Sequence, residues 1–129
     1  MYCGTDPSSE ELQKMTSFVE KQKTLIVASS DFCHYGNRFG YAPVFAGKTA
    51  QETVDELNMA AFEAMKVSAE AFRANLEDTD NTICGRHTIF TGLELLKKGY
   101  HAEIKSYTRS SILKNNKDSS VSYMGIIIE

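Results

Sequence analysis

Apolar side chains recur at helical spacing in four stretches of the chain, and these stretches predict helices. The predicted helices are Ser9–Gln22, one that follows Thr49, a shorter one that follows Ser68, and residues 88–98. Ser8 and Thr49 each stand three residues before a glutamate, which is the spacing of a capping box. The second helix has the clearest apolar face, formed by Ala50, Val54, Leu57, Ala61 and Met65.

Three apolar runs predict strands. Thr24–Ser29 does not alternate with polar residues, which is typical of a strand covered on both faces in a parallel sheet. Ala102–Tyr107 alternates as a half-exposed strand does, and Val121–Ile128 is dense enough in apolar residues to be a central strand. Residues 110–120 form a polar loop between them. The pattern predicts an α/β fold, with helices layered around a mostly parallel or mixed sheet in a single domain over residues 1–129.

Charge and composition exclude some classes of binding partner and cellular location. The net charge is -3 and no basic stripe is present, which argues against nucleic acid or an anionic membrane as the main partner. No stretch approaches the roughly 20 apolar residues of a membrane-spanning helix, and the N-terminus lacks signal-peptide features, so we expect a cytoplasmic protein without membrane insertion. Cys3, Cys33 and Cys84 are odd in number and widely spaced, which predicts free thiols or metal ligands instead of a disulfide framework.

The segment Ser29–Gly36 places a carboxylate, a thiol and an imidazole directly after a predicted buried strand. His34 has the chemistry of a general acid or base near neutral pH, and Asp31 that of a group that orients it or binds substrate. The same residues also fit a structural role. In that interpretation Asp31 caps a turn, Cys33 packs in the core and His34 bonds a backbone carbonyl.

The segment Asn81–His87 precedes a predicted helix, where free N–H groups and the helix dipole favour a thiolate at Cys84. A thiolate binds metals or attacks electrophiles, and Arg86 adds positive charge nearby. A structural cysteine in a turn is the alternative. A closed zinc site needs about four ligands at short spacings. Cys84 with His34 or His87 makes only a partial set, and no Gly-x-Ser-x-Gly motif indicates a hydrolase.

Three segments together resemble the Memo family. The chain carries Ser-Ser-Asp-Phe-Cys-His-Tyr-Gly at Ser29–Gly36, Asn-Thr-Ile-Cys-Gly-Arg-His at Asn81–His87, and Asp-Ser-Ser-Val-Ser-Tyr at Asp118–Tyr123. Members of this family carry similar motifs in the same order, and the resemblance extends from about Gly4 to the C-terminus.

The resemblance implies a fold like that of class III extradiol dioxygenases, with a pocket that binds iron or copper through two histidines and one cysteine. Cys84 matches the cysteine ligand, and Asp31 and His34 match residues that line the pocket. Arg86 and His87 match the motif without an assigned role. The two histidine ligands of the family belong to an N-terminal half that this sequence does not include, so a complete ligand set requires another chain or a substitute histidine.

Three functions follow from these observations. The first is a signalling or redox adaptor linked to cell motility, which binds a phosphotyrosine peptide, a signalling protein or a metal through the pocket around Asp31, His34 and Cys84. The second is a non-haem metal-dependent oxidoreductase in which His34 handles protons. The third is a truncated, inactive remnant, whose unpaired strand edges would favour aggregation.

Overall fold

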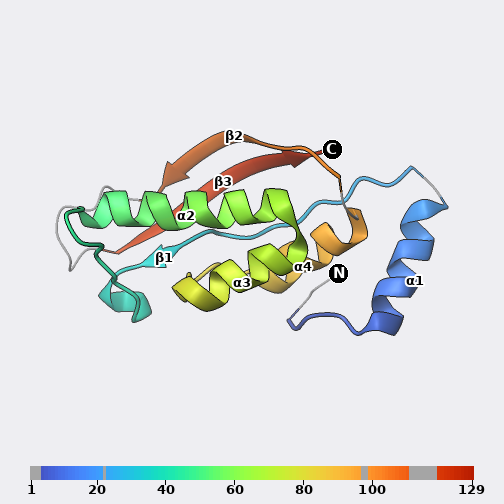
Figure 1. Ribbon diagram of the computed structural model, residues 1–129, viewed down its shortest axis with the longest axis horizontal. Coiled ribbons are helices and arrows are strands. Elements are labelled where there is room, and N and C mark those ends of the chain that lie inside the picture. The colour runs from blue at the N-terminus through green and yellow to red at the C-terminus, as the bar shows by residue number, and fades with distance from the viewer. Residues whose placement is uncertain (1–3, 22, 97–98, 111–118) are drawn as a thin grey trace.

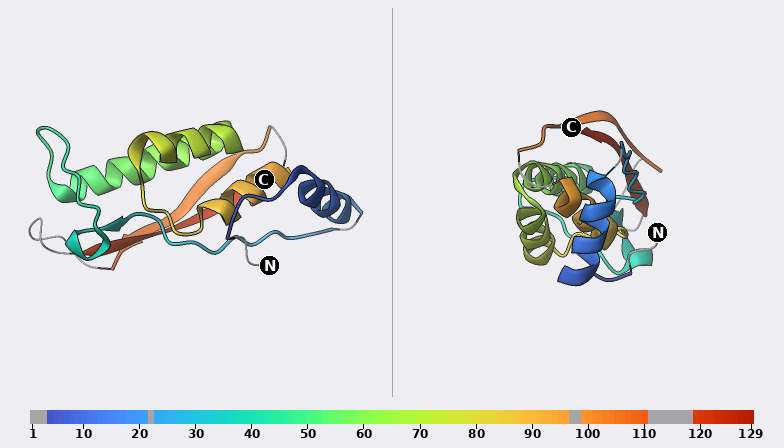
Figure 2. Two further views of the ribbon diagram at one scale, coloured as in Figure 1. Left: turned by 90° about the horizontal axis from the view of Figure 1, so that it is seen from below. Right: turned by 90° about the vertical axis from the view of Figure 1, so that its right-hand side faces the viewer.

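A computed structural model describes residues 4–21, 23–96, 99–110 and 119–129. The elements, in chain order, are α1 (Ser9–Glu20), β1 (His34–Tyr35), the 3-10 helix η1 (Asn37–Phe39), α2 (Ala50–Val67), α3 (Ala69–Thr79), α4 (Arg86–Leu96), β2 (Ala102–Arg109) and β3 (Ser120–Ile128). Figure 1 shows α2 running along the curved ribbon of β2 and β3, with α3 and α4 beside it and α1 at one end. Helices and sheet therefore form two layers, which Figure 2 shows edge-on.

The sheet has the order β1-β3-β2, and both pairings among the described residues are antiparallel. Ala102 lies opposite Ile128 and Arg109 opposite Ser122, while His34 lies opposite Val121. The prediction of a central last strand is confirmed, but the mostly parallel sheet is not formed by the described residues. Antiparallel strands that follow each other in sequence need only a short connection, whereas a parallel pair needs a crossover of a dozen residues or more.

The predicted strand at Thr24–Ser29 is wrong, since residues 23–33 form no regular secondary structure. Leu25 is 87% exposed and Val27 is 78% exposed, so this run is not covered on both faces. Its side chains share an apolar groove of about 280 Å³ with the facing part of β3, lined among others by Ile26, Phe32, Leu93, Met124 and Ile126. An apolar run becomes a strand only where neighbouring backbone pairs with it. In the described chain, β3 offers that pairing only farther along, at residues 32–35.

The helices form where the sequence predicts them. Both capping boxes are present, with Ser8 and Thr49 each accepting a hydrogen bond from a backbone N–H in the first turn, and Ser68 caps α3. The last helix starts at Arg86, two residues earlier than predicted, because the backbone bond from Ile89 to the Gly85 carbonyl already closes its first turn. Residues 22, 97–98 and 111–118, which include the ends of the predicted helices Ser9–Gln22 and 88–98 and most of the predicted loop 110–120, lie outside the described residues. Among the described helices, none combines the length and apolarity needed to cross a membrane.

Two clusters of buried side chains join the layers. The larger one gathers residues of α2, α3 and α4 together with Phe32 and Ile83. The smaller one contains Cys33, Tyr35, Ala50 and Val54. Phe32 and Cys33 are neighbours in the chain but pack into different clusters, so the backbone between them is held on both sides.

We expect Leu25→Ser combined with Val27→Ser to reduce aggregation with little loss of stability. The two side chains are mostly exposed, so the substitutions remove apolar surface from solvent without opening a cavity. Light scattering and urea unfolding measure the two effects. The control is Leu57→Ala, since Leu57 is 1% exposed and its truncation should cost about 2 to 5 kcal/mol. Equal destabilisation by the double variant and by the control would contradict the exposed position of this segment.

Candidate functional site

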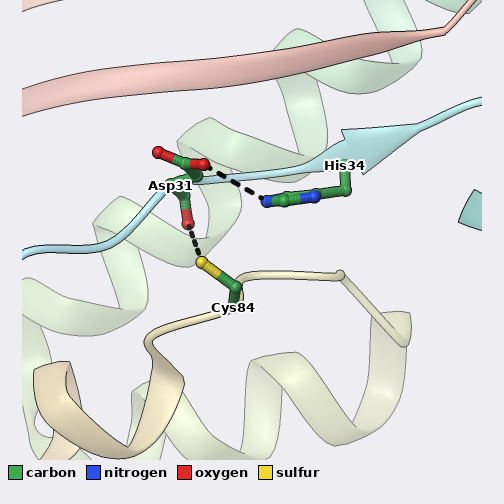
Figure 3. Close-up of side chains that lie close together, drawn as sticks. All are labelled: Asp31, His34 and Cys84. Carbon is green, nitrogen blue, oxygen red and sulfur yellow. Dashed lines mark hydrogen bonds and ion pairs between the residues drawn. The ribbon is translucent and has the colours of Figure 1, made fainter. Parts of the chain in front are cut away.

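Two segments that lie far apart in the sequence meet beside β1. One carries Asp31 and continues into β1, whose first residue is His34, and the other is the turn before α4 that carries Cys84. One ligand atom from each of the three side chains lies within 4.8 Å of the other two. Figure 3 shows the His34 ring facing the Asp31 carboxylate and the Cys84 sulfur facing the Asp31 backbone carbonyl. The structure therefore brings together the three residues that match the pocket of the family, Asp31, His34 and Cys84.

The ring of His34 is positioned by packing instead of by strong hydrogen bonds. Its edge meets the ring of Phe39, with centroids 5.1 Å apart and an interplanar angle of 78°. Its Nε2 atom lies 3.7 Å from Asp31 Oδ2, which is too long for a hydrogen bond. Nε2 is buried and has no hydrogen-bond partner among the described residues. A buried ring nitrogen without a partner has its lone pair or its proton available for a ligand.

Cys84 contributes an exposed free thiol. Its Sγ atom lies 3.9 Å from the Asp31 carbonyl oxygen and 3.9 Å from Ser30 Oγ, both of them weak sulfur contacts. The segment that carries this thiol is anchored by Asn81, which is 1% exposed and donates from Nδ2 to the Leu57 carbonyl of α2 at 3.2 Å. The thiol is therefore accessible, while the backbone that presents it is fixed to the helical layer.

Two hydroxyl groups connect the two segments of the site. Ser30 Oγ accepts from the Gly85 N–H at 2.8 Å and donates to the Asp31 carbonyl at 2.8 Å. Thr82 Oγ1 accepts from the His34 N–H at 2.8 Å and donates to the His34 carbonyl at 2.8 Å. Neither residue was singled out from the sequence, although both belong to the segments considered there. Their role depends on which segments become neighbours, which the sequence does not show.

A chain of hydrogen bonds from α2 and β2 also holds the backbone at the site. The fully buried Asn58 accepts from the Cys33 N–H at 3.1 Å and donates to the Tyr107 hydroxyl at 3.0 Å. That hydroxyl donates to Asp55 at 2.6 Å, and Asp55 also pairs with Arg109 at 3.3 Å. Burial, followed by the hydrogen bond to Asp55, raises the pKa of Tyr107. The sequence analysis missed Asn58, although an asparagine beside Leu57 on an apolar helical face was a usable signal.

Cys33 differs from Cys84 in its exposure to solvent. It is fully buried, and burial raises the pKa of its thiol to about 11. The interpretation of Cys33 as a packed core thiol is confirmed. A protonated, inaccessible thiol is a poor nucleophile and a poor metal ligand.

His87 and Arg86 lie outside this cluster. His87 Nδ1 is 2.7 Å from Asp6 Oδ1, and Arg73 pairs with the other oxygen of Asp6 at 2.7 Å. These residues and Arg86 line a separate pocket of about 350 Å³ between α3 and α4. In the third sequence motif, Ser120 and Ser122 are buried on β3, and Asp118 lies outside the described residues. The Ser122 backbone hydrogen-bonds to Phe32 and Cys33, so this motif holds the backbone between Asp31 and His34 in place.

The donor set of the cluster suits a transition metal. Imidazole nitrogen, thiolate sulfur and carboxylate oxygen are common ligands of iron, copper and zinc. Bonds of about 2.0 to 2.3 Å let one ion contact donors up to about 4.5 Å apart, so small rotations of the three side chains are sufficient. The buried Nε2 of His34, which has no hydrogen-bond partner among the described residues, is the observation that best supports a role for His34 as a metal ligand.

Comparison with known proteins gives a consistent result. The family model described as "Memo-like protein" matches residues 4–127. "Protein MEMO1" of Homo sapiens is 34% identical over 130 aligned residues, covering 92% of this chain and 43% of that protein. "Protein memo-1 homolog" of Caenorhabditis elegans is 34% identical over 121 residues, covering 82% of this chain and 33% of that protein. The chain thus spans less than half the length of these relatives.

We expect Gly85→Ala to destabilise the fold by roughly 1 to 3 kcal/mol, because a Cβ atom there would lie 2.5 Å from Ser30 Cβ. Gly92→Ala in α4 is the matched control. A Cβ atom at Gly92 meets no atom within 4 Å, so this change should stabilise the helix by about 0.5 to 1 kcal/mol. Urea unfolding measures both. Equal effects of the two substitutions would show that the two segments do not approach as closely as described.

We also expect alkaline pH to destabilise the protein through Cys33. The pKa of this thiol is about 11 in the folded chain and 9.0 for an unperturbed thiol, so the unfolded state loses the proton first. The stability from the protonated thiol is complete below about pH 9. It is lost by about pH 11, a fall of roughly 3 kcal/mol. Urea unfolding from pH 8 upward should show a smaller fall for Cys33→Ala, and an identical fall would contradict this assignment.

Proposed function

Because the chain belongs to the Memo-like protein family, we propose that it is a metal-binding signalling protein whose pocket holds one iron or copper ion. Asp31, His34 and Cys84 are the proposed ligands. The observation that carries this proposal is the convergence of their three donor atoms within 4.8 Å, from segments separated by about 50 residues in the sequence. The likeness of the family to class III extradiol dioxygenases supports a metal pocket at this position.

Each side chain has a distinct part in the proposed site. Cys84, as a thiolate, and the Asp31 carboxylate supply negative charge that compensates a cation, and His34 supplies a neutral nitrogen through Nε2. The partial burial of the His34 ring limits access of water on one side, while the exposure of Cys84 leaves the other side open to a ligand. In relatives with two histidine ligands, the remaining positions would come from the part of those proteins that this chain does not span.

In the proposed adaptor role, the open side of the pocket receives a signalling partner, such as a phosphotyrosine peptide, in cytoplasmic signalling linked to cell motility and redox state. The free thiol of Cys84 beside a redox-active ion would make such binding sensitive to oxidation. A pull-down with phosphorylated and unphosphorylated forms of one peptide separates this role from non-specific binding. Retention of the phosphorylated form alone, lost on Cys84→Ala, is the supporting result.

The second candidate function is a non-haem metal-dependent oxidoreductase. The bound ion would supply oxygen activation, and the unpartnered His34 Nε2 is the observation that favours a proton-handling group in the pocket. Oxygen consumption with a catechol-like substrate, dependent on added metal and lost in His34→Ala, distinguishes this function from the adaptor role.

We expect the purified chain to bind about one ferrous or cuprous ion per molecule under anaerobic conditions. Cys84→Ala should weaken binding by at least about 100-fold, since it removes one of three ligands, and His34→Ala should do the same. Elemental analysis after desalting and a competition titration with a chelator give stoichiometry and affinity.

Two control variants test whether these losses are specific. Cys3→Ser keeps both described cysteines, and His101→Ala removes an exposed histidine that is not part of the cluster. Both should bind metal as the native chain does. Absence of metal from the folded native chain, or unchanged binding by Cys84→Ala, would overturn the proposed site.

A further inference from the structure

We propose that Ser30 and Thr82 are positioning residues, whose hydroxyl groups hold the two segments of the candidate site in the arrangement that brings His34 and Cys84 together. This inference rests on the proposed metal-binding function, because positioning matters to chemistry only if the three donor atoms act as one site. Neither hydroxyl is itself assigned as a metal ligand.

Thr82 fixes the backbone of His34 from the segment that carries Cys84. Its hydroxyl accepts from the His34 N–H and donates to the His34 carbonyl, each at 2.8 Å. A hydroxyl group has one proton and two lone pairs, so one Thr82 side chain satisfies both peptide groups at the same time. Neighbouring peptide groups are occupied by β3, which bonds to Phe32 and Cys33. The backbone of Phe32 and Cys33 is therefore held by β3, and the backbone of His34 is held by Thr82.

Ser30 makes the reciprocal connection at the other end of the site. Its hydroxyl accepts from the N–H of Gly85, the residue after Cys84, and donates to the Asp31 carbonyl, each at 2.8 Å. The Asp31 carbonyl is also the backbone oxygen that lies 3.9 Å from Cys84 Sγ. Ser30 thus links the backbone of one proposed ligand to the backbone next to another.

The close approach of the segments makes these two bonds specific. A Cβ atom on Gly85 would lie 2.5 Å from Ser30 Cβ and 2.6 Å from Ser30 Oγ, so the backbone at Gly85 sits directly against the serine. In the described chain, the two segments are joined by hydrogen bonds at each end, through Thr82 to His34 and through Ser30 to Gly85. Loss of either hydroxyl leaves a backbone donor without its partner and loosens the spacing between His34 and Cys84.

The test compares Thr82→Val, which keeps the shape and removes the hydroxyl, with Thr82→Ser, which keeps the hydroxyl. Thr108→Val is the matched control, since Thr108 is an exposed strand residue far from the site in sequence. Two readouts need no metal, namely hydrogen exchange of the His34 amide and the rate of Cys84 modification by a thiol reagent. A third readout is the dissociation constant for ferrous ion.

We expect Thr82→Val to speed His34 amide exchange at least about tenfold and to weaken metal binding about 10- to 100-fold, the range for residues that orient ligands. Thr82→Ser and Thr108→Val should match the native chain. Unchanged amide exchange and metal affinity in folded Thr82→Val would overturn the inference.

Ser30→Ala keeps the inference testable if Thr82→Val fails to fold. It should change the rate of Cys84 modification and weaken metal binding within the same range, and no effect on either would overturn the inference. A native chain that binds no metal, combined with faster His34 exchange in Thr82→Val, would overturn the proposed function while showing that the hydroxyl still positions the segment.

Discussion

The structure depends on the hydrogen bonding of one short stretch, Phe32 to His34. Its peptide groups are bonded by the Ser122 backbone of β3, by the Asn58 side chain of α2 and by the Thr82 hydroxyl. A buried backbone group without a partner costs as much as a lost hydrogen bond, so these bonds to three elements fix the stretch where those elements meet. The sheet, the longest helix and the turn before α4 are thereby held together at the candidate site.

Because this stretch is held in place, neighbouring residues lie in two different environments, the buried core and the partly exposed candidate site. The side chain of Cys33 points into the core, where burial raises the pKa of its thiol to about 11, whereas Asp31 and His34 remain partly accessible beside the exposed Cys84. Several reactive groups keep one geometry on a surface when a rigid scaffold supports the backbone that carries them. Here the apolar core that contains Phe32 and Cys33 supports the backbone, and the cluster of Asp31, His34 and Cys84 lies directly next to it.

The same stretch marks the limit of regular pairing. Before residue 32, the apolar run at residues 24–29 forms no regular secondary structure and is mostly exposed, although its composition favours a strand. Strand formation needs a neighbour with free donors and acceptors, and hydrophobicity alone does not supply one. The chain spans less than half the length of the relatives it matches.

The sequence by itself determined the helices and the chemistry that the site offers. Capping boxes and apolar periodicity are local signals within a few residues, so α1, α2 and α3 begin where Ser8, Thr49 and Ser68 predict, and the motifs already contain Asp31, His34 and Cys84. Only the tertiary structure decided the antiparallel pairing, the exposure of residues 24–29, the difference between the two described cysteines, and the supporting roles of Ser30, Asn58 and Thr82. Each of these depends on contacts between residues about 13 or more positions apart, and local propensity does not specify which distant segments become neighbours.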